Sequence, residues 1–216
     1  MMYKIPVDNF IFDLDGTLVD SIGDIAYSLQ IAYQNLGLIY NPDLLVIGPP
    51  LEDIIEILTP SVSEKQKQNI IAEFRKHYSH SDFSRTIPYQ GVVEVLKTLQ
   101  SQGKRLFIAT NKPKNGSKML LNALDLNYFE FVGTPDYIEG QLMTKTEVIK
   151  YIVANYHLDP NKTLMVGDTH PDIIAGKNNQ LLTLAFTGGY GEKEKIALEE
   201  PILSIHEFKE ILNKTK

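Results

Sequence analysis

The sequence contains no cysteine, and no uncharged run in it approaches the length of a membrane span. The lack of cysteine excludes disulfides, thiol nucleophiles and thiolate metal ligands, so reactive groups must come from oxygen and nitrogen side chains. The N-terminal segment Met-Met-Tyr-Lys-Ile-Pro also lacks the apolar region of a secretory signal. We therefore expect a cytoplasmic protein with no membrane partner.

Basic residues are too few to outweigh the acidic ones. The chain has 21 Lys and Arg against 27 Asp and Glu, which gives a net charge of −6 and argues against a nucleic-acid partner. Hydrophobic residues make up 43% of the chain and charged residues 22%, which are ordinary globular values. With 216 residues, the chain suits one large domain or one domain with a smaller insert.

Two carboxylates leave an apolar run directly before a glycine turn. The run Phe10-Ile-Phe12 predicts a buried strand, and the period of two along a strand places Asp13 and Asp15 on one side. Gly16 then ends the strand. A capped strand end with solvated acids is the alternative, but two such close carboxylates, if partly buried, favour a shared proton or a bound cation.

The next part of the chain has helical spacing. Apolar stripes run from Ile22 to Leu36 and from Leu51 to Leu58. A third helix is expected to start at Ser61, because Ser61 and Glu64 have capping-box spacing. Residues 19–86 are therefore expected to be all helical.

Strands and helices alternate through the rest of the chain. The expected strands are Arg105–Asn111, Phe129–Val132, Thr163–Asp168 and Leu181–Phe186, and the expected helices include Glu147–Tyr156 and Ile173–Asn178. This alternation predicts an α/β fold with a doubly wound parallel sheet. Residues 1–18 and 87–216 would form this core, and residues 19–86 would form an all-helical cap domain inserted after the first strand.

Polar residues follow three of these apolar strands, and parallel strands bring their carboxyl ends to one edge. The residues are Asp13 and Asp15, Thr110 and Asn111, and Asp168 with Asp172 four positions later. Such a repeated pattern is hard to explain by stability alone. The shared edge is therefore the expected functional site.

These residue types suit phosphoryl transfer. A carboxylate fixed at a strand end can attack phosphorus and form an aspartyl-phosphate, and Asp13 is the better nucleophile because it ends the rigid strand. Asp15 is placed to protonate the leaving oxygen and later to deprotonate water. Mg²⁺ prefers hard oxygen ligands, so Asp13 with Asp168 or Asp172 predicts a magnesium site.

The phosphoryl oxygens need partners too. The hydroxyl of Thr110 and the backbone amide of Asn111 are candidates to hold one of these oxygens. One lysine should balance the charge of the transferring group.

Four segments together resemble, in order, the four motifs of the haloacid dehalogenase superfamily, and most closely its phosphoglycolate phosphatase-like branch. They are Asp13-Leu-Asp-Gly-Thr-Leu-Val-Asp-Ser21, Thr110-Asn111, a lysine near Lys145, and Gly167-Asp-Thr-His-Pro-Asp172. The resemblance implies that Asp13 is the nucleophile and Asp15 the acid/base, whose backbone carbonyl also binds Mg²⁺. It implies that Asp168 and Asp172 are the acids of the metal site.

The third motif departs from the family pattern. Most relatives have Lys-Pro there, whereas this chain reads Met143-Thr-Lys-Thr-Glu147. Lys145 is the best match because it directly precedes the helix expected from Glu147. Lys112 and Lys150 are the alternatives.

The combined reading is a Mg²⁺-dependent phosphatase that acts on a small phosphorylated metabolite, with phosphoglycolate as the substrate that the resemblance suggests. A phosphomutase or pyrophosphatase of the same superfamily would use the same residues. A phospho-accepting receiver module is a more distant alternative, against which the second acid, Asp15, and the helical insert argue. The resemblance also argues against dehalogenation, because dehalogenases lack an acid at the position of Asp15.

Overall fold

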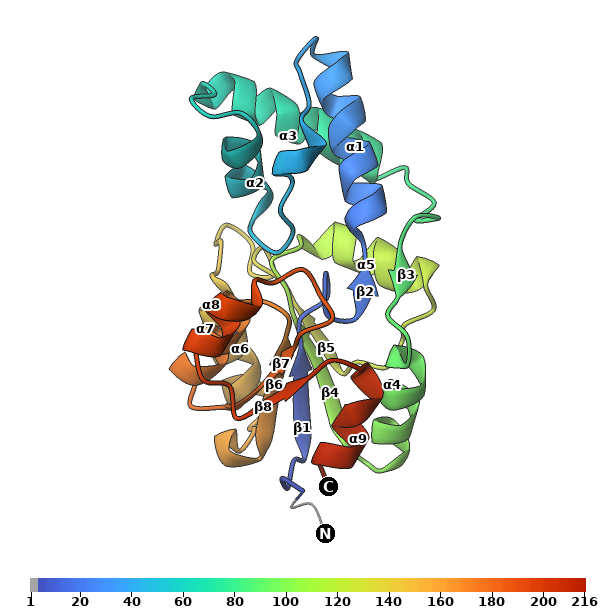
Figure 1. Ribbon diagram of the computed structural model, residues 1–216, viewed down its shortest axis with the longest axis vertical. Coiled ribbons are helices and arrows are strands. Elements are labelled where there is room, and N and C mark those ends of the chain that lie inside the picture. Colours follow the sequence, from blue (N-terminus) through green and yellow to red (C-terminus); the bar gives the residue numbers. More distant parts are fainter. Residues whose placement is uncertain (1–3) are drawn as a thin grey trace.

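Parallel strands form the central sheet of the computed structural model, which describes residues 4–216 (Figure 1). Within this part of the chain the sheet has six strands: β5 (Phe131–Gly133), β4 (Arg105–Ala109), β1 (Asn9–Phe12), β6 (Thr163–Gly167), β7 (Leu182–Phe186) and β8 (Leu203–Ile205), in spatial order. Every neighbouring pair in it is parallel. The expected α/β fold with a parallel sheet is therefore confirmed.

Helices cover both faces of this sheet. They are α4 (Val92–Ser101), α5 (Lys114–Ala123), α6 (Lys145–Asn155), α7 (His170–Asn178), α8 (Lys193–Leu198) and α9 (Ile211–Lys214). The alternating side chains of β1 show why two layers form: Phe10 and Phe12 join the core that contains α4, α5 and α9, whereas Ile11 joins the core of α6 and α7. All three side chains are fully buried.

The register brings the polar strand ends together. Phe12, the last residue of β1, pairs with Ile108 of β4 on one side and Val166 of β6 on the other. The backbone amide of Asp13 extends this pattern by donating to the carbonyl of Val166 at 2.9 Å. Because β4, β1 and β6 are neighbours, the residues that follow them meet at one edge.

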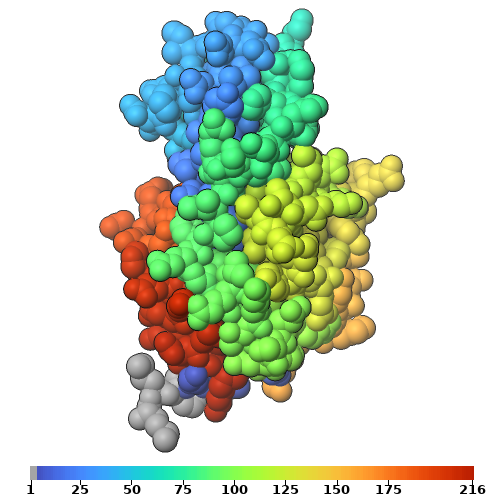
Figure 2. All heavy atoms as spheres, turned by 90° about the vertical axis from the view of Figure 1, so that its right-hand side faces the viewer, coloured from blue at the N-terminus to red at the C-terminus, as the bar shows by residue number. Residues whose placement is uncertain are grey.

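The helical segment lies above this edge and forms a lobe of its own in the space-filling view (Figures 1 and 2). It contains α1 (Ile22–Asn35), the 3₁₀ helix η1 (Pro42–Leu44), α2 (Leu51–Leu58) and α3 (Glu64–Tyr78). Two short antiparallel strands, β2 (Val19–Asp20) and β3 (Ile87–Pro88), join it to the body. The expectation that all of residues 19–86 are helical is thus wrong at its start, where Val19 and Asp20 pair with the returning chain.

A buried acid fixes the two chain connections of this segment. Asp24, in the first turn of α1, accepts hydrogen bonds from the hydroxyls of Ser81 and Thr86 and from the backbone amide of Arg85. It is almost fully buried, and these three donors compensate for the loss of water. These hydrogen bonds therefore tie the start of α1 to the segment that leads from α3 back to the sheet.

The structure moves the starts of three predicted helices. Helix α3 is capped by Ser63, which pairs with Gln66 in a capping box, and not by Ser61, whose φ of 67° excludes an extended cap. Helix α6 starts at Lys145 instead of Glu147, because Thr144 caps it with Glu147 at the third position. Helix α7 starts at His170 rather than Ile173 for the same reason, with Asp172 at the third position of the box.

The strand expected at Phe129–Val132 is shifted as well: in the structure it is β5 and covers Phe131–Gly133. Glu130 precedes it and donates its backbone amide to the carbonyl of Leu106.

The remaining 3₁₀ helices are η2 (Pro160–Lys162) and η3 (Phe208–Glu210). In residues 4–216 no helix is both long enough and apolar enough to span a membrane.

Candidate active site

Asp13 and Lys145 form the centre of the candidate site. The ammonium group of Lys145 lies 2.7 Å from Asp13 Oδ1 and 2.5 Å from Asp172 Oδ1. Lys145 is the first residue of α6, so the Thr144 cap that starts this helix also aims the lysine at the end of β1. The structure thus brings together three of the residues proposed from sequence.

Asp172 is held by both of its oxygens. Its Oδ2 accepts hydrogen bonds from the backbone amide of Thr169 at 3.0 Å and from the hydroxyl of Thr169 at 2.6 Å, while Oδ1 accepts from Lys145. Gly167 makes this approach possible, because a Cβ there would come within 2.6 Å of Asp172 Oδ2. The capping box of α7 therefore orients a site carboxylate.

Asp168 is also held by two donors. Its Oδ1 accepts from the hydroxyl of Thr17 at 2.8 Å, and its Oδ2 accepts from the backbone amide of Tyr190 at 2.9 Å. The loop that carries Tyr190 passes close, since a Cβ on Gly189 would lie 2.5 Å from Asp168 Oδ2. The glycine-rich segment Gly188–Gly191 therefore packs against the site.

The three buried carboxylates of Asp13, Asp168 and Asp172 offer a metal site. One oxygen from each lies within 4.8 Å of the others. Oxygen ligands of this kind suit a hard divalent cation such as Mg²⁺. Among the described residues, the carboxylate of Asp15 is outside this group, and the contribution of its backbone carbonyl stays a prediction.

The charge balance of the site also favours a divalent cation. Within residues 4–216, four buried carboxylates, those of Asp13, Asp15, Asp168 and Asp172, face two ammonium groups, those of Lys112 and Lys145. Burial of unbalanced charge is unfavourable unless a partner is bound. The excess of two negative charges equals the charge of one divalent cation.

Proton affinity reflects the same crowding of carboxylates. Burial raises the pKa of Asp13 well above its ordinary value; Lys145 opposes the shift, and the charges of Asp172 and Asp168 add to it. Burial and the charge of Asp172 raise the pKa of Asp168 to about 7. Lys145 remains a cation, because Asp13 and Asp172 raise its pKa and outweigh the opposing effect of burial.

Asp15 faces a different set of partners. Its Oδ1 accepts a hydrogen bond from the hydroxyl of Ser21 at 2.5 Å and lies 3.0 Å from the ammonium group of Lys112. Strand β1 ends at Phe12 and the chain bends at Leu14, so the expected period of two does not extend from Asp13 to Asp15. The two acids of the first motif are thus close in sequence but have separate cationic partners.

Thr110 and Asn111 follow β4 at the same edge. Thr110 is buried, and its hydroxyl accepts a hydrogen bond from the backbone amide of Lys112 at 3.0 Å. The side chain of Asn111 donates to the carbonyl of Gly48 at 2.8 Å, which ties the helical segment to the sheet edge. Gly48 itself has φ +114°, and a Cβ on it would lie 3.2 Å from Thr169.

The three lysines that are candidates for the third motif have different surroundings in the structure. Lys145 contacts Asp13, Lys112 contacts Asp15, and Lys150 is exposed farther along α6. The hydrogen bonds of the site acids with Thr17, Ser21, Thr169 and Tyr190 were not predicted from the sequence. Thr17, Ser21 and Thr169 lie within the quoted motifs and were open to inference, but Tyr190 had no such signal.

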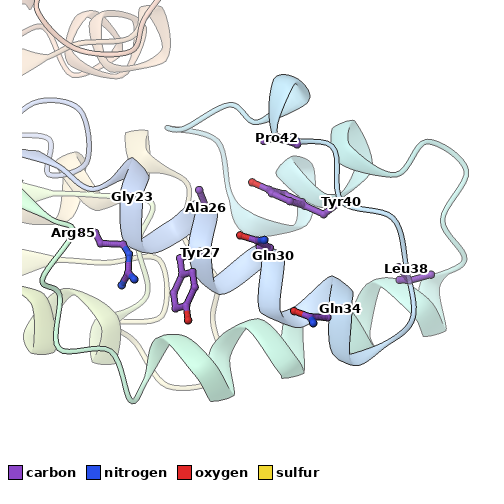
Figure 3. A pocket seen from close by; sticks show the side chains of 9 residues that line it. All are labelled: Gly23, Ala26, Tyr27, Gln30, Gln34, Leu38, Tyr40, Pro42 and Arg85. Atoms are coloured by element: carbon purple, nitrogen blue, oxygen red, sulfur yellow. The ribbon is translucent and has the colours of Figure 1, made fainter.

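A surface groove of about 620 Å³ lies elsewhere, along α1 (Figure 3). Its lining residues are Gly23, Ala26, Tyr27, Gln30, Gln34, Leu38, Tyr40, Pro42 and Arg85. The one cation among them, Arg85, stacks 4.1 Å above the ring of Tyr27. The groove therefore does not contain the carboxylate cluster, and the chemistry is assigned to the sheet edge.

Comparison with known proteins identifies the family of the chain. The model of the family described as haloacid dehalogenase-like hydrolase matches residues 10–186. A phosphoglycolate phosphatase of Aquifex aeolicus is 35% identical over 184 residues, covering 83% of this chain and 84% of the relative. The pyrophosphatase PpaX of Anoxybacillus flavithermus is 29% identical over 215 residues, covering 96% of each chain.

Solved structures share the whole fold. A haloacid dehalogenase-like hydrolase from Streptococcus pneumoniae superposes with a TM-score of 0.85 at 24% identity. The superposition covers 96% of this chain and 98% of the other. The likeness thus extends over both the sheet and the helical segment.

Proposed function

Because the chain belongs to the haloacid dehalogenase-like hydrolase family, we propose that it is a Mg²⁺-dependent phosphatase that hydrolyses a small phosphorylated metabolite. The observation that carries this proposal is the convergence of Lys145 and Asp172 on Asp13 at the end of β1. A nucleophilic carboxylate, a fixed cation and a metal-binding group are the parts that phosphoryl transfer needs.

The metal would be held by Asp13, Asp168 and Asp172, together with the backbone carbonyl of Asp15. Bound Mg²⁺ would offset the negative charge of the phosphoryl oxygens. Thr17 and the backbone amide of Tyr190 fix Asp168, and Thr169 fixes Asp172, so the protein orients its own ligands before a metal arrives.

The reaction proceeds in two displacements. In the first, a carboxylate oxygen of Asp13 attacks phosphorus, the bond from phosphorus to the leaving oxygen breaks, and Asp15 gives its proton to that oxygen. In the second, water attacks phosphorus, Asp15 takes the proton of this water, and the bond to Asp13 breaks. Free phosphate leaves, and both carboxyl groups return to their starting states.

Lys145 and Thr110 bind and orient the transferring group. The ammonium group of Lys145 already lies against the nucleophile, so it is placed to balance negative charge on the phosphoryl oxygens. Thr110 and the backbone amide of Asn111 follow the neighbouring strand and are assigned to one phosphoryl oxygen. Thr110 and Asn111 directly follow β4, which pairs in register with β1, and Lys145 is the first residue of α6.

Residues 19–86 are proposed to act as a cap domain over a core of residues 1–18 and 87–216. The hydrogen bond from Asn111 to Gly48 supports this role, because it joins the loop before α2 to the phosphoryl-binding motif. A cap held there would exclude water from the site and leave room only for a small substrate.

Phosphoglycolate is the first substrate to test, because a phosphoglycolate phosphatase is 35% identical to this chain. Pyrophosphate is the second, because a pyrophosphatase aligns with 96% of the chain. Purified protein should release phosphate from at least one of them, and from p-nitrophenyl phosphate, with Mg²⁺ present and not after treatment with EDTA.

The panel should also contain a nucleoside 5′-monophosphate and a hexose phosphate. The substrate with the highest kcat/KM then defines the class. An isomerisation of the hexose phosphate that depends on a sugar bisphosphate, without phosphate release, would instead identify a phosphomutase. Failure to release phosphate from every compound in the presence of Mg²⁺ would contradict the proposed function.

A further inference from the structure

Asp15 has a buried lysine of its own, and the proposed reaction has not used it. Lys112 Nζ lies 3.0 Å from Asp15 Oδ1, and only 8% of the lysine side chain and 11% of the aspartate side chain are exposed. Lys112 follows β4, whereas Lys145 is the first residue of α6. The two lysines thus approach the two acids of the first motif from different elements.

The contacts of Asp15 fall on one of its two oxygens. Oδ1 accepts a hydrogen bond from Ser21 at 2.5 Å and faces Lys112, whereas among residues 4–216 no hydrogen bond involves Oδ2. A carboxyl oxygen that faces two donors is a poor place for a proton. When Asp15 is protonated, the proton is therefore directed to Oδ2.

Lys112 is fixed in turn by the helical segment. Tyr78, the last residue of α3, places its ring centroid 5.0 Å from Lys112 Nζ, and the aromatic ring is almost fully buried. Tyr78 is itself held by Phe74, which stacks on it, and by Phe83, which meets its edge. A cation over an aromatic face gains roughly 0.5–2 kcal/mol, more when water is excluded.

Lys112 stays protonated although its side chain is buried. Burial alone would favour the neutral amine, but the charge of Asp15 outweighs it and raises the pKa of Lys112 above its ordinary value. The lysine therefore presents a permanent positive charge to Asp15.

We propose that Lys112 is a positioning residue which fixes the acid/base Asp15 so that Oδ2 carries the transferable proton, and that Tyr78 of the helical segment holds Lys112 in place. The proposal rests on the proposed function, since it assigns a role within that reaction. It also gives the helical segment a part in assembling the acid, because Tyr78 reaches Lys112 only when this segment sits on the sheet edge.

The test compares two substrates that differ in their need for an acid. p-Nitrophenolate leaves readily without a proton, whereas the alkoxide of an alkyl phosphate such as phosphoglycolate does not. The quantity to measure is kcat/KM, because it reports the steps up to departure of the leaving group and excludes the shared hydrolysis of the aspartyl-phosphate. The ratio of the two values within one preparation does not depend on how much of the protein is folded.

Lys112→Met should lower kcat/KM for the alkyl phosphate about 100-fold or more, the size expected for loss of a positioned acid, and by less than about tenfold for p-nitrophenyl phosphate. In Lys112→Arg, the ratio of kcat/KM for the alkyl phosphate to kcat/KM for p-nitrophenyl phosphate should return much of the way to that of the unaltered protein, because arginine keeps the charge. Tyr78→Leu should shift the ratio in the same direction by roughly tenfold, whereas Tyr78→Phe, which keeps the ring, should leave it near that of the unaltered protein.

Lys114→Met is the matched control, because Lys114 is exposed two residues further along. An equal loss on both substrates in Lys112→Met and Tyr78→Leu would overturn the inference and leave the proposed function standing. No turnover of any compound in the panel by the unaltered protein would overturn the proposed function, and the inference with it.

Discussion

The ammonium group of Lys145 lies 2.7 Å from Asp13 Oδ1, although 132 residues separate the two in the chain. Both side chains are buried, and the same nitrogen also reaches Asp172. A cation in this position lowers the cost of placing three carboxylates together before substrate binds. In the proposed reaction, this cation would then be available to the phosphoryl oxygens.

Lys145→Met should therefore reduce kcat/KM for p-nitrophenyl phosphate by about 10²–10³, the loss typical of removing one preorganised group that stabilises developing charge. Lys150→Met is the control, because this lysine lies on the same helix and is exposed. A large loss in the control, with little change in Lys145→Met, would move the role away from Lys145.

Asp13→Asn should abolish turnover and leave the fold intact. The amide has nearly the shape of the carboxylate but cannot act as the nucleophile. Because burial already raises the pKa of Asp13, a neutral side chain is well tolerated at this position in the absence of metal. Circular dichroism and the Tm should match those of the unaltered protein, and Asp8→Asn, at an exposed acid before the same strand, should retain activity. Full activity in Asp13→Asn would rule out the aspartyl-phosphate.

The placement of the site acids could be predicted from sequence because it depends on strong local patterns. The apolar run Phe10-Ile-Phe12 and the alternation of strands and helices are enough to bring Asp13, Thr110 and Asp168 to one edge of a parallel sheet. The catalytic roles of these residues remain predictions.

Contacts between distant segments could not be predicted in the same way. Tyr190 lies 22 residues after Asp168 and 170 residues after Asp20, in a glycine-rich loop that has no periodic pattern. The pairing of Lys112 with Asp15 likewise depends on how two loops meet above the sheet. The start of α3 was misassigned because Ser61 and Ser63 both have a suitable side chain, and the backbone of Ser61 decides between them.

Removal of metal should have an effect that depends on pH. Burial and the charge of Asp172 raise the pKa of Asp168 from 3.8 to about 7, so the folded metal-free protein holds this proton more tightly than the unfolded chain. The resulting stability is fully present below about pH 4 and is lost as the pH rises through about 7. In EDTA the Tm should therefore decrease as the pH rises from about 4 to about 7.

Added Mg²⁺ should raise the Tm at pH 8 and have progressively less effect below pH 7, because the proton on Asp168 competes with the metal. Asp168→Asn removes one of the titrating groups and should weaken both dependences, to which the raised pKa of Asp13 still contributes. Thermal melting with EDTA and with Mg²⁺ at several pH values gives the comparison. A Tm rise with Mg²⁺ that is as large at pH 5 as at pH 8 would contradict a metal site that includes Asp168.

The hydroxyl of Tyr190 joins the core to the base of the helical segment. It donates to Asp20 Oδ1 at 2.7 Å and accepts from the backbone amides of Ser21 at 2.7 Å and Ile22 at 3.1 Å. Burial and Asp20 raise the pKa of Tyr190, so the hydroxyl stays protonated and remains a donor. Tyr190→Phe removes all three bonds and leaves partly buried amide groups without this acceptor.

Tyr190→Phe should thus lower the free energy of unfolding by about 1–3 kcal/mol, the cost of leaving buried polar groups without partners. It should also lower kcat/KM, because the Ser21 amide that it releases belongs to the residue that holds Asp15. Tyr40→Phe is the control: its hydroxyl is buried and has no hydrogen-bond partner among residues 4–216, so its removal should be neutral or stabilising. Urea unfolding measures both variants, and equal stability would show that the Tyr190 hydroxyl does not fix this junction.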